Sequence, residues 1–296
     1  MGYELWTSPI TGYRRKGTRL AELRTLIDDG ITAHAILEPL KSVNVNAPAG
    51  EAAEALKRRD FDVAGVKGEA HEPVVNWVLT DSLKGGHVRD HMQPISTDHL
   101  VSDATPLPTL LGVLKKKPYT FVLIGPDVSG IITRADLNKP PVRVYLFGLI
   151  SLLEMHLSFW AQAEYPNDSW QAELSPRRLE AAKKIQEDRR KRNQDPFLVQ
   201  CLQFCDRRDL AIGKDALRDR LGLGSEEAAL NFLKKAEDLR NVLAHSHHDL
   251  ADGSSWEELI DVVERIESVV KNSDRCVEEK ARVLGAQYND ALWTGA

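Results

Sequence analysis

The sequence has few cysteines and lacks a long apolar segment near its beginning. Only three cysteines occur among 296 residues, all in the second half of the chain. Cys201, Cys205 and Cys276 make neither a disulfide framework nor the paired spacing of a zinc site. Without an apolar run of signal-peptide length, we expect a protein of the reducing cytoplasm that has no membrane association.

The chain also lacks the excess of positive charge that is common in proteins that bind nucleic acid over a broad surface. Residues 1–140 contain 17 basic and 17 acidic residues, so the remainder carries the whole net charge of −5. Any RNA would therefore bind a local basic patch. The best candidate is residues 177–192, where eight basic residues fall within sixteen positions. The run is also typical of a solvated helical face, and it ends with Arg189, Arg190, Lys191 and Arg192.

Length and composition indicate two globular domains of ordinary soluble type, since 42% of the residues are hydrophobic and 28% are charged. Strand and helix patterns alternate over residues 31–139, after a lead segment of residues 1–30. Residues 140–284 show helical patterns alone, and residues 285–296 form a tail. We therefore expect an α+β domain followed by an all-α domain, with the two prolines after Lys139 as a stiff joint.

The first domain contains an internal repeat of roughly sixty residues. Each unit has the pattern strand–helix–strand–strand–helix (βαββα), because apolar residues alternate in the expected strands and recur every three or four positions in the expected helices. The expected strands are residues 31–36, 62–66, 73–79, 100–101, 119–124 and 129–133, and the expected helices are residues 49–59, 81–85 and 106–114.

The second repeat ends in the sequence Gly-Ile-Ile-Thr-Arg-Ala-Asp-Leu at residues 130–137. Gly130 would let the strand pass close to a ligand. The Thr133 hydroxyl and Arg134 suit phosphate oxygens, and the Asp136 carboxylate suits ribose hydroxyls. The alternative is that Thr133 and Asp136 cap the following helix, as these residue types often do.

This motif and the start of the second repeat, residues 101–107, resemble a tandem CBS-domain pair, whose pattern is G-[VI]-[VI]-T-x-x-D-L. The resemblance implies a regulatory domain that binds an adenine nucleotide such as AMP, ADP or ATP. The first repeat departs from the pattern, because Leu79 stands at the threonine and Ser82 at the aspartate. We therefore expect at most one well-formed nucleotide site in each chain.

The second domain opens with a long apolar helix over residues 142–163. Its expected core residues are Val144, Phe147, Leu149, Ile150, Leu153, Leu157 and Trp160. Glu154 and His156 are the polar exceptions. The pattern alone leaves open whether Glu154 points to solvent.

A later helix carries the most informative polar residues of the chain. Its apolar stripe recurs at helical spacing from Ala229 to Leu243, and Arg240, Asn241 and His245 lie at its end, off that stripe. Imidazole transfers protons near neutral pH, and guanidinium binds phosphate oxygens, so the pair suits cleavage of a phosphodiester without a metal. The two side chains are separated by about 140° on an ideal helix. They can meet at one phosphate only if the helix ends near the histidine or a second copy contributes.

Arg-Asn-x-x-x-His on the penultimate helix resembles the R-x4-6-H signature of the HEPN family, whose active members are metal-independent, dimeric endoribonucleases of all-helical fold. The resemblance implies that Arg240 and His245 are catalytic, with Asn241 as the usual polar neighbour. His247 stands where related toxins have a tyrosine, and Glu154 stands where some members have an acidic residue facing the active site. It further implies an RNA substrate, a 2′,3′-cyclic phosphate product and a role in stress or phage defence.

The alternative from another class is a catalytically silent, nucleotide-responsive module for binding or dimerisation. In that case the helical domain would be a dimerisation surface, and Arg240 and His245 would bind a nucleotide phosphate or a partner. A third interpretation gives the two residues no ligand: Arg240 would cap its helix or pair with Glu237, and His245 would be an ordinary surface histidine. A transcriptional regulator is disfavoured, because the sequence has no helix-turn-helix with a basic recognition helix.

Overall fold

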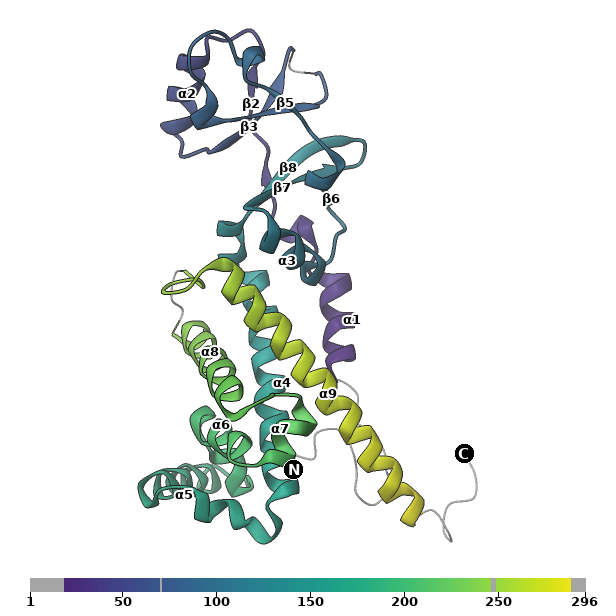
Figure 1. The fold of residues 1–296 in the computed structure, drawn as a ribbon, viewed down its shortest axis with the longest axis vertical. Coiled ribbons are helices and arrows are strands. Elements are labelled where there is room, and N and C mark those ends of the chain that lie inside the picture. Colours follow the sequence, from purple (N-terminus) through teal and green to yellow (C-terminus); the bar gives the residue numbers. More distant parts are fainter. Residues whose placement is uncertain (1–18, 70, 246–248, 289–296) are drawn as a thin grey trace. The chain divides into compact units, whose positions relative to one another are not determined.

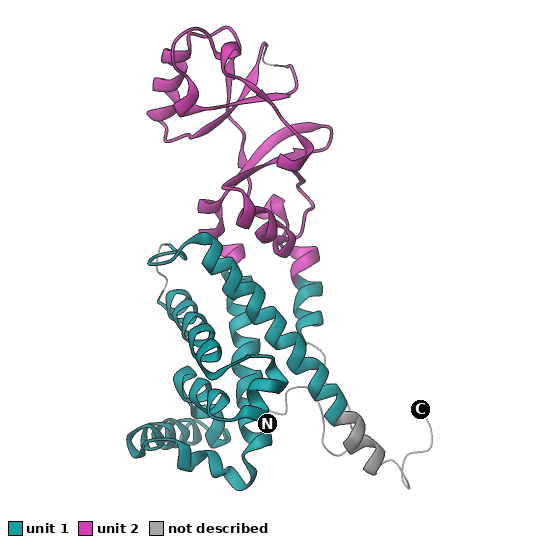
Figure 2. Cartoon of the chain, viewed as in Figure 1, with its two compact units in different colours: residues 1–26, 143–296 teal, residues 27–142 magenta. Residues whose placement is uncertain are grey.

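The computed structural model describes residues 19–69, 71–245 and 249–288, and it divides the chain into two compact units (Figures 1 and 2). Residues 27–142 form one unit, here called the sheet unit. Residues 1–26 and 143–296 belong to the other, here called the helical unit. Helix α1 (Leu20–Gly30) and helix α4 (Pro140–Glu164) cross the division between the units.

The sheet unit contains two four-stranded sheets, with strand orders β2-β3-β4-β5 and β1-β8-β7-β6. In each sheet a helix connects two parallel strands, and an antiparallel strand follows. The first sheet and its helix comprise β2 (Ser42–Asn44), α2 (Ala49–Lys57), β3 (Val63–Lys67), β4 (Asn76–Leu79) and β5 (Gln93–Pro94). The second comprises β1 (Glu38–Pro39), β6 (Leu100–Ser102), α3 (Leu107–Lys116), β7 (Tyr119–Ile124) and β8 (Asp127–Thr133).

The strand register confirms the predicted internal repeat. Asn76 of β4 pairs with Val66 of β3, and Gly130 of β8 pairs with Val122 of β7 in the equivalent place. Each sheet also takes an edge strand from the segment that leads into the other repeat. β1, which precedes β2, pairs with β8 of the second sheet, and β5, which precedes β6, pairs with β4 of the first. The two repeats therefore exchange edge strands.

The predicted strand at residues 31–36 is wrong. Only Thr32 makes a bridge, to Pro106, and residues 33–35 form a short 3₁₀ helix, η1. The buried side chains are Ala33 and Ile36, which are three positions apart, so the segment buries residues with a helical spacing. The predicted helix at residues 81–85 is also wrong in kind. Only a short 3₁₀ helix, η2 (Thr80–Ser82), forms there. The corresponding 3₁₀ helices η3 (Val88–Asp90) and η4 (Thr97–His99) flank β5.

Aromatic side chains from both sheets meet inside the sheet unit. Trp77 of β4 lies 5.7 Å from Tyr119 and 5.8 Å from Phe121 of β7, measured between ring centroids. His99 stacks on Tyr119 at 6.2 Å. Trp77 and Phe121 are buried, so these contacts hold the two sheets together through apolar burial and ring packing.

The regular structure of residues 143–288 is entirely helical where the structure describes it. Its elements after α4 are η6 (Pro166–Glu173), α5 (Pro176–Arg190), η7 (Leu198–Cys201), α6 (Phe204–Ile212), α7 (Asp215–Leu221), α8 (Glu226–Ala244) and α9 (Trp256–Tyr288). The predicted core residues of α4 are buried from Leu149 to Trp160, but Val144 and Phe147 are exposed. They lie on a face of α4 that the helical unit does not cover. The prediction failed there because α4 is apolar on more than one side, and only some of those sides are buried.

Among the described residues, α4 is also the one helix long and apolar enough to cross a bilayer, and 61% of its most apolar window is buried inside the protein. A buried polar network connects it to α9. Ser273 of α9 accepts a hydrogen bond from Trp160 Nε1 at 2.6 Å and forms another with His156 Nδ1. The His156 Nε2 atom lies 3.9 Å from the Asp274 carboxylate. Because Asp274 also accepts from the Leu20 backbone N–H, the network fixes the start of α1 as well.

Candidate active site

Helix α8 places the predicted catalytic residues at its carboxyl end. Ser225 begins the helix as its N-cap, since its hydroxyl accepts a hydrogen bond from the Ala228 N–H. Ala236 and Leu239 are buried on the inward side of the helix. The helix ends at Ala244, and His245 is the C-cap residue, with its backbone N–H bonded to the Asn241 carbonyl at 3.0 Å.

Arg240 lies one turn after the buried Ala236, so its side chain leaves α8 on the inward side, contrary to the expectation from the apolar stripe. Its Nε atom is 3.5 Å from Glu154 Oε1 on α4. Its Nη1 atom donates to Asn241 Oδ1 at 3.2 Å. The side chain is 44% exposed, so solvent or a ligand can still reach the guanidinium. The structure therefore brings Arg240, Asn241 and Glu154 together, and Glu154 is in contact with two helices.

Arg207 of α6 is part of the same cluster, and the sequence analysis missed it. Its Nη1 atom donates to Glu154 Oε2 at 2.8 Å, and its side chain is only 10% exposed. Its Nη2 atom is 3.4 Å from the Gln200 carbonyl, whereas its Nε atom is buried without an acceptor among the described residues. Burial lowers the pKa of Arg207 from its ordinary value, although Glu154 opposes the effect. Glu154 is thus shared by one buried and one exposed guanidinium.

Further ion pairs connect the helices around this cluster. Arg208 binds Glu237, so the alternative pairing of Arg240 with Glu237 is not the one that forms. Arg178 of α5 binds Asp206 and also Asp209, the latter at 2.7 Å. Burial by itself would lower the pKa of Arg178, but its hydrogen bonds to the two aspartates outweigh burial and raise that pKa above its ordinary value.

His245 is exposed, and its ψ of 7° departs from the helical value. This termination meets one of the two conditions under which the imidazole and the Arg240 guanidinium could turn toward one phosphate. His247 lies outside the described residues.

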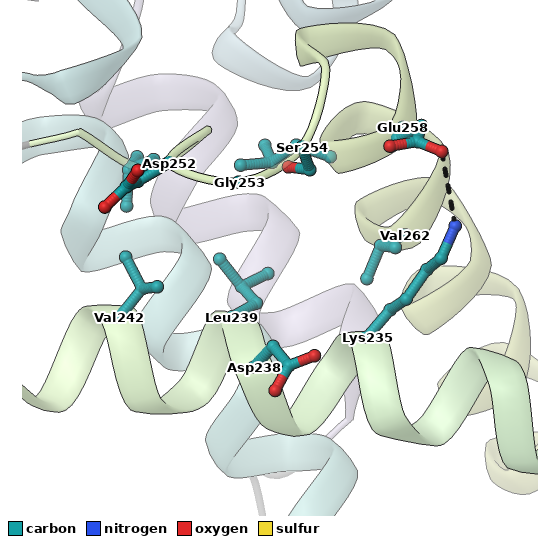
Figure 3. A pocket seen from close by; sticks show the side chains of 11 residues that line it. Lys235, Asp238, Leu239, Val242, Asp252, Gly253, Ser254, Glu258 and Val262 are labelled. Atoms are coloured by element: carbon teal, nitrogen blue, oxygen red, sulfur yellow. Dashed lines mark ion pairs between the residues drawn. The ribbon is translucent and has the colours of Figure 1, made fainter.

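The hollow beside α8 does not contain the predicted catalytic residues. A cavity of about 290 Å³ lies between α8, α9 and the segment that joins them (Figure 3). Buried apolar side chains line its interior, and a Lys235–Glu258 ion pair of 3.6 Å spans part of its rim. Its lining comprises Lys235, Asp238, Leu239, Val242, Leu250, Asp252, Gly253, Ser254, Glu258, Leu259 and Val262. Residues 235, 238, 239 and 242 share a face of α8, and Arg240 projects from the roughly opposite side of the helix.

The predicted RNA-binding residues lie at the end of α5 and just beyond it. Arg189, Arg190, Lys191 and Arg192 are all exposed. Arg190 donates to Asp195 at 3.2 Å, and Lys191 lies 3.3 Å from Asp188. These exposed pairs reduce the local positive charge and contribute little stability.

In the sheet unit, Thr133 and Asp136 form a capping box at the start of η5 (Arg134–Asn138). Asp136 Oδ2 accepts from the Thr133 N–H at 2.7 Å and from its hydroxyl at 2.9 Å, while Oδ1 pairs with Lys139 at 2.9 Å. Burial would lower the pKa of Lys139, but its bonds to Glu38 and Asp136 outweigh burial and raise it. The two motif residues are therefore adjacent, and both are used in helix capping.

Gly130 and Arg134 have structural partners that the sequence analysis did not foresee. Arg134 donates from Nε to the Leu114 carbonyl at 2.8 Å and from Nη2 to the Lys115 carbonyl at 3.0 Å, so it caps the end of α3. A side chain at Gly130 would come within 3.0 Å of Val122 and 3.4 Å of Leu37. Close packing of β8 against its neighbours therefore explains the glycine. It makes room for these two side chains, whereas the sequence analysis expected it to make room for a ligand.

The first repeat has no side-chain cap equivalent to that of Thr133 and Asp136. Leu79 and Ser82 occupy the positions of Thr133 and Asp136, since η2 follows β4 as η5 follows β8. Ser82 donates its hydroxyl to the Leu79 carbonyl at 2.7 Å.

Within the described ranges, no three histidine, cysteine, aspartate or glutamate side chains are arranged to hold a metal ion. The three cysteines are thiols, and burial raises the pKa of both Cys201 and Cys276.

No protein-family model and no curated protein sequence matches the chain. Solved structures match part of it. The CBS-pair protein CBSX2 from Arabidopsis thaliana is 21% identical, and the match covers 40% of this chain and 95% of that chain with a TM-score of 0.33. The CBS domain of the bacterial CNNM/CorC family Mg2+ transporter, in complex with ATP, is 15% identical over 40% of this chain and 91% of that chain, with a TM-score of 0.33. An uncharacterized conserved protein from Pyrococcus horikoshii is 16% identical over 36% and 88%, with a TM-score of 0.32.

Proposed function

We propose that this protein is a metal-independent endoribonuclease whose activity responds to an adenine nucleotide. The observation that carries the proposal is the placement of Arg240: a half-exposed guanidinium, held by Glu154 and Asn241, close to the helix end that carries His245. A guanidinium positioned in this way can bind a phosphodiester through two parallel hydrogen bonds. The nearby imidazole supplies a group that exchanges protons near neutral pH.

In the proposed reaction His245 removes the proton from a ribose 2′-hydroxyl, and the 2′-oxygen attacks the adjacent phosphorus. The bond from phosphorus to the 5′-oxygen breaks, and that oxygen takes up a proton. Arg240 stabilises the negative charge that develops on the phosphate oxygens, and Asn241 orients the guanidinium. The products are a 2′,3′-cyclic phosphate and a 5′-hydroxyl. A homodimer would let His245 of one copy act on a phosphate held by Arg240 of the other.

The regulatory half of the proposal concerns the sheet unit. Its two βαββα repeats and the motif at residues 130–137 resemble a CBS pair, which would sense AMP, ADP or ATP. The ligand's ribose would be recognised by Asp136, with Thr133 nearby, after the capping bonds rearrange. Arg134 is assigned no phosphate contact, because its guanidinium already caps α3. We further propose that the protein acts in the cytoplasm, in a stress or phage-defence role, as a toxin-like ribonuclease.

The nuclease is tested with purified protein, mixed RNA substrates and EDTA, with and without adenine nucleotides. We expect cleavage that leaves a 2′,3′-cyclic phosphate, and a loss of roughly a hundredfold or more in His245→Ala and in Arg240→Ala. His71→Ala, which changes an exposed histidine of the sheet unit, is the matched control and should retain full activity. Equal rates for His245→Ala and the wild type would remove the imidazole from the mechanism.

The sensor is tested by thermal shift against AMP, ADP and ATP. Asp136→Asn should reduce the shift that the ligand produces, measured from each variant's own melting temperature. Asp127→Asn, at an exposed aspartate that begins the preceding strand β8, should leave that shift unchanged. If no adenine nucleotide shifts the wild type, the sheet unit has no role as an adenine sensor.

A second candidate is a catalytically silent, nucleotide-responsive module for binding or dimerisation. It is favoured by the exposed Val144 and Phe147 on α4, and by the cavity beside α8, which excludes Arg240 and His245. Failure to cut several RNA pools under all nucleotide conditions, together with a nucleotide-induced thermal shift, would support this candidate over the nuclease.

A further inference from the structure

In the structure Arg240 is paired with Glu154, although the proposed function requires Arg240 to bind phosphate. The two carboxylate oxygens of Glu154 have different partners: Oε2 accepts from Arg207 at 2.8 Å, and Oε1 lies 3.5 Å from Arg240. The first contact is short and involves an arginine side chain that is only 10% exposed, whereas the second is longer and involves an arginine side chain that is 44% exposed. The Arg240 contact is therefore the weaker of the two.

Arg207 makes the weaker contact exchangeable. A partly buried carboxylate that lost its only cation would be strongly destabilised, which would hold Arg240 in place. Because Arg207 remains bound to Glu154, the carboxylate stays neutralised when Arg240 moves away. Arg207 itself is nearly buried and its Nε atom has no acceptor among the described residues, so Glu154, which it contacts directly, is its main counter-charge, with Asp206 contributing less.

We infer that Glu154 is an internal competitor for the phosphate site: it binds Arg240 in the absence of RNA, and Arg207 is the positioning residue that allows the exchange. The inference rests on the proposed function for the identity of the anion, a phosphodiester. Binding of the RNA backbone replaces the Arg240–Glu154 contact with an Arg240–phosphate contact. Glu154 then keeps Arg207 as its partner. RNA binds more weakly than it would without Glu154, because the Arg240–Glu154 contact has to be broken.

The test measures binding separately from cleavage, with a 2′-O-methyl RNA oligonucleotide that cannot undergo 2′-hydroxyl attack. Glu154→Gln should lower the Kd by about two- to fivefold, the factor that corresponds to an exposed ion pair. Glu237→Gln is the matched control for the general effect of removing a negative charge, because Glu237 has similar exposure and binds Arg208. It should change the Kd by less than Glu154→Gln does.

Two further variants assign the effect to the cluster. In the Arg240→Ala background, Glu154→Gln should not lower the Kd, since Glu154 then has no Arg240 side chain to bind. Arg207→Met should weaken binding, because Arg240 then remains as the sole counter-ion of Glu154. Adding Glu154→Gln to Arg207→Met should restore binding to the level of Glu154→Gln alone. Melting temperatures of all variants identify any that are unfolded. Glu154→Gln should melt at a lower temperature than the wild type, because the nearly buried Arg207 loses its carboxylate partner. The double variant Arg207→Met/Glu154→Gln removes that uncompensated charge and tests the same gain in binding.

Several outcomes would overturn the inference: a Kd for Glu154→Gln equal to or above that of the wild type, a gain that persists without Arg240, or no binding by wild type and variant alike. Cleavage is assayed in parallel with unmodified RNA. Wild-type protein that binds the analogue and shows the Arg240-dependent gain, but does not cut RNA, would reject the nuclease and retain the competition at an anion site.

Discussion

Replacing Ser273 with alanine should destabilise the helical unit far more than the loss of one hydroxyl suggests. The hydroxyl binds both Trp160 Nε1 and His156 Nδ1, and all three side chains are fully buried. Water cannot replace it at this depth. A buried polar group that loses its partner costs about 1–3 kcal/mol, so two such groups give roughly 2–4 kcal/mol, allowing for the carboxylate near His156.

Hydrogen exchange followed by mass spectrometry measures this loss in α4 and α9 directly, without unfolding of the sheet unit. An opening free energy lower by 2–4 kcal/mol corresponds to exchange that is roughly 30- to 900-fold faster. Ser268→Ala, at an exposed serine of the same helix, is the control and should change exchange by less than about threefold. If both variants exchange at the same rate, the reasoning that the Ser273 hydroxyl satisfies two buried groups is wrong.

The remaining predictions concern local contacts. Ser225→Ala should lower the free energy of unfolding by about 1 kcal/mol in urea denaturation, because its hydroxyl caps α8, whereas Ser175→Ala, at an N-cap without a side-chain bond, should change it by less than about 0.5 kcal/mol. Gly130→Ala should lower the melting temperature through overpacking in β8, but Gly112→Ala, in an open part of α3, should raise it. The hydrogen bonds from a lysine and a serine lower the pKa of Asp98 to about 2, so NMR should show its carboxyl titrating near that pH. Any stability that the carboxylate contributes should be lost only as the pH falls below about 4 toward 2, and a titration midpoint near 4 would contradict this.

The periodic parts of the fold could be predicted from the sequence. Strands β3, β4, β6, β7 and β8 and helices α2, α3, α4 and α8 follow from apolar spacing. The prediction failed at residues 31–36, where alternating apolar residues belong to a 3₁₀ turn. It also failed at Val144 and Phe147, because apolar character alone does not say which face of a helix meets a partner. Such choices are made by tertiary contacts with distant segments.

The candidate site was predictable only in part. Arg240, Asn241 and His245 fall within six positions, so their place at the end of one helix could be predicted from the apolar spacing. The contact between Arg240 and Glu154 joins residues 86 positions apart, and no pattern in the sequence fixes it. Arg207 lies among several charged residues of α6, and among the arginines of that helix only its burial distinguishes it. The roles of Arg134 and Gly130 were likewise decided by three-dimensional packing.

The exchange of edge strands has a consequence for how this protein can be dissected. A fragment that stops between the repeats would keep β1 without the sheet to which it belongs, and the fragment that follows would leave β8 with an uncovered row of backbone donors and acceptors. Neither half is a self-sufficient folding module. Gene truncations meant to isolate one repeat should therefore yield aggregating material, and the shortest expressible version of this region has to run continuously from before β1 to beyond β8.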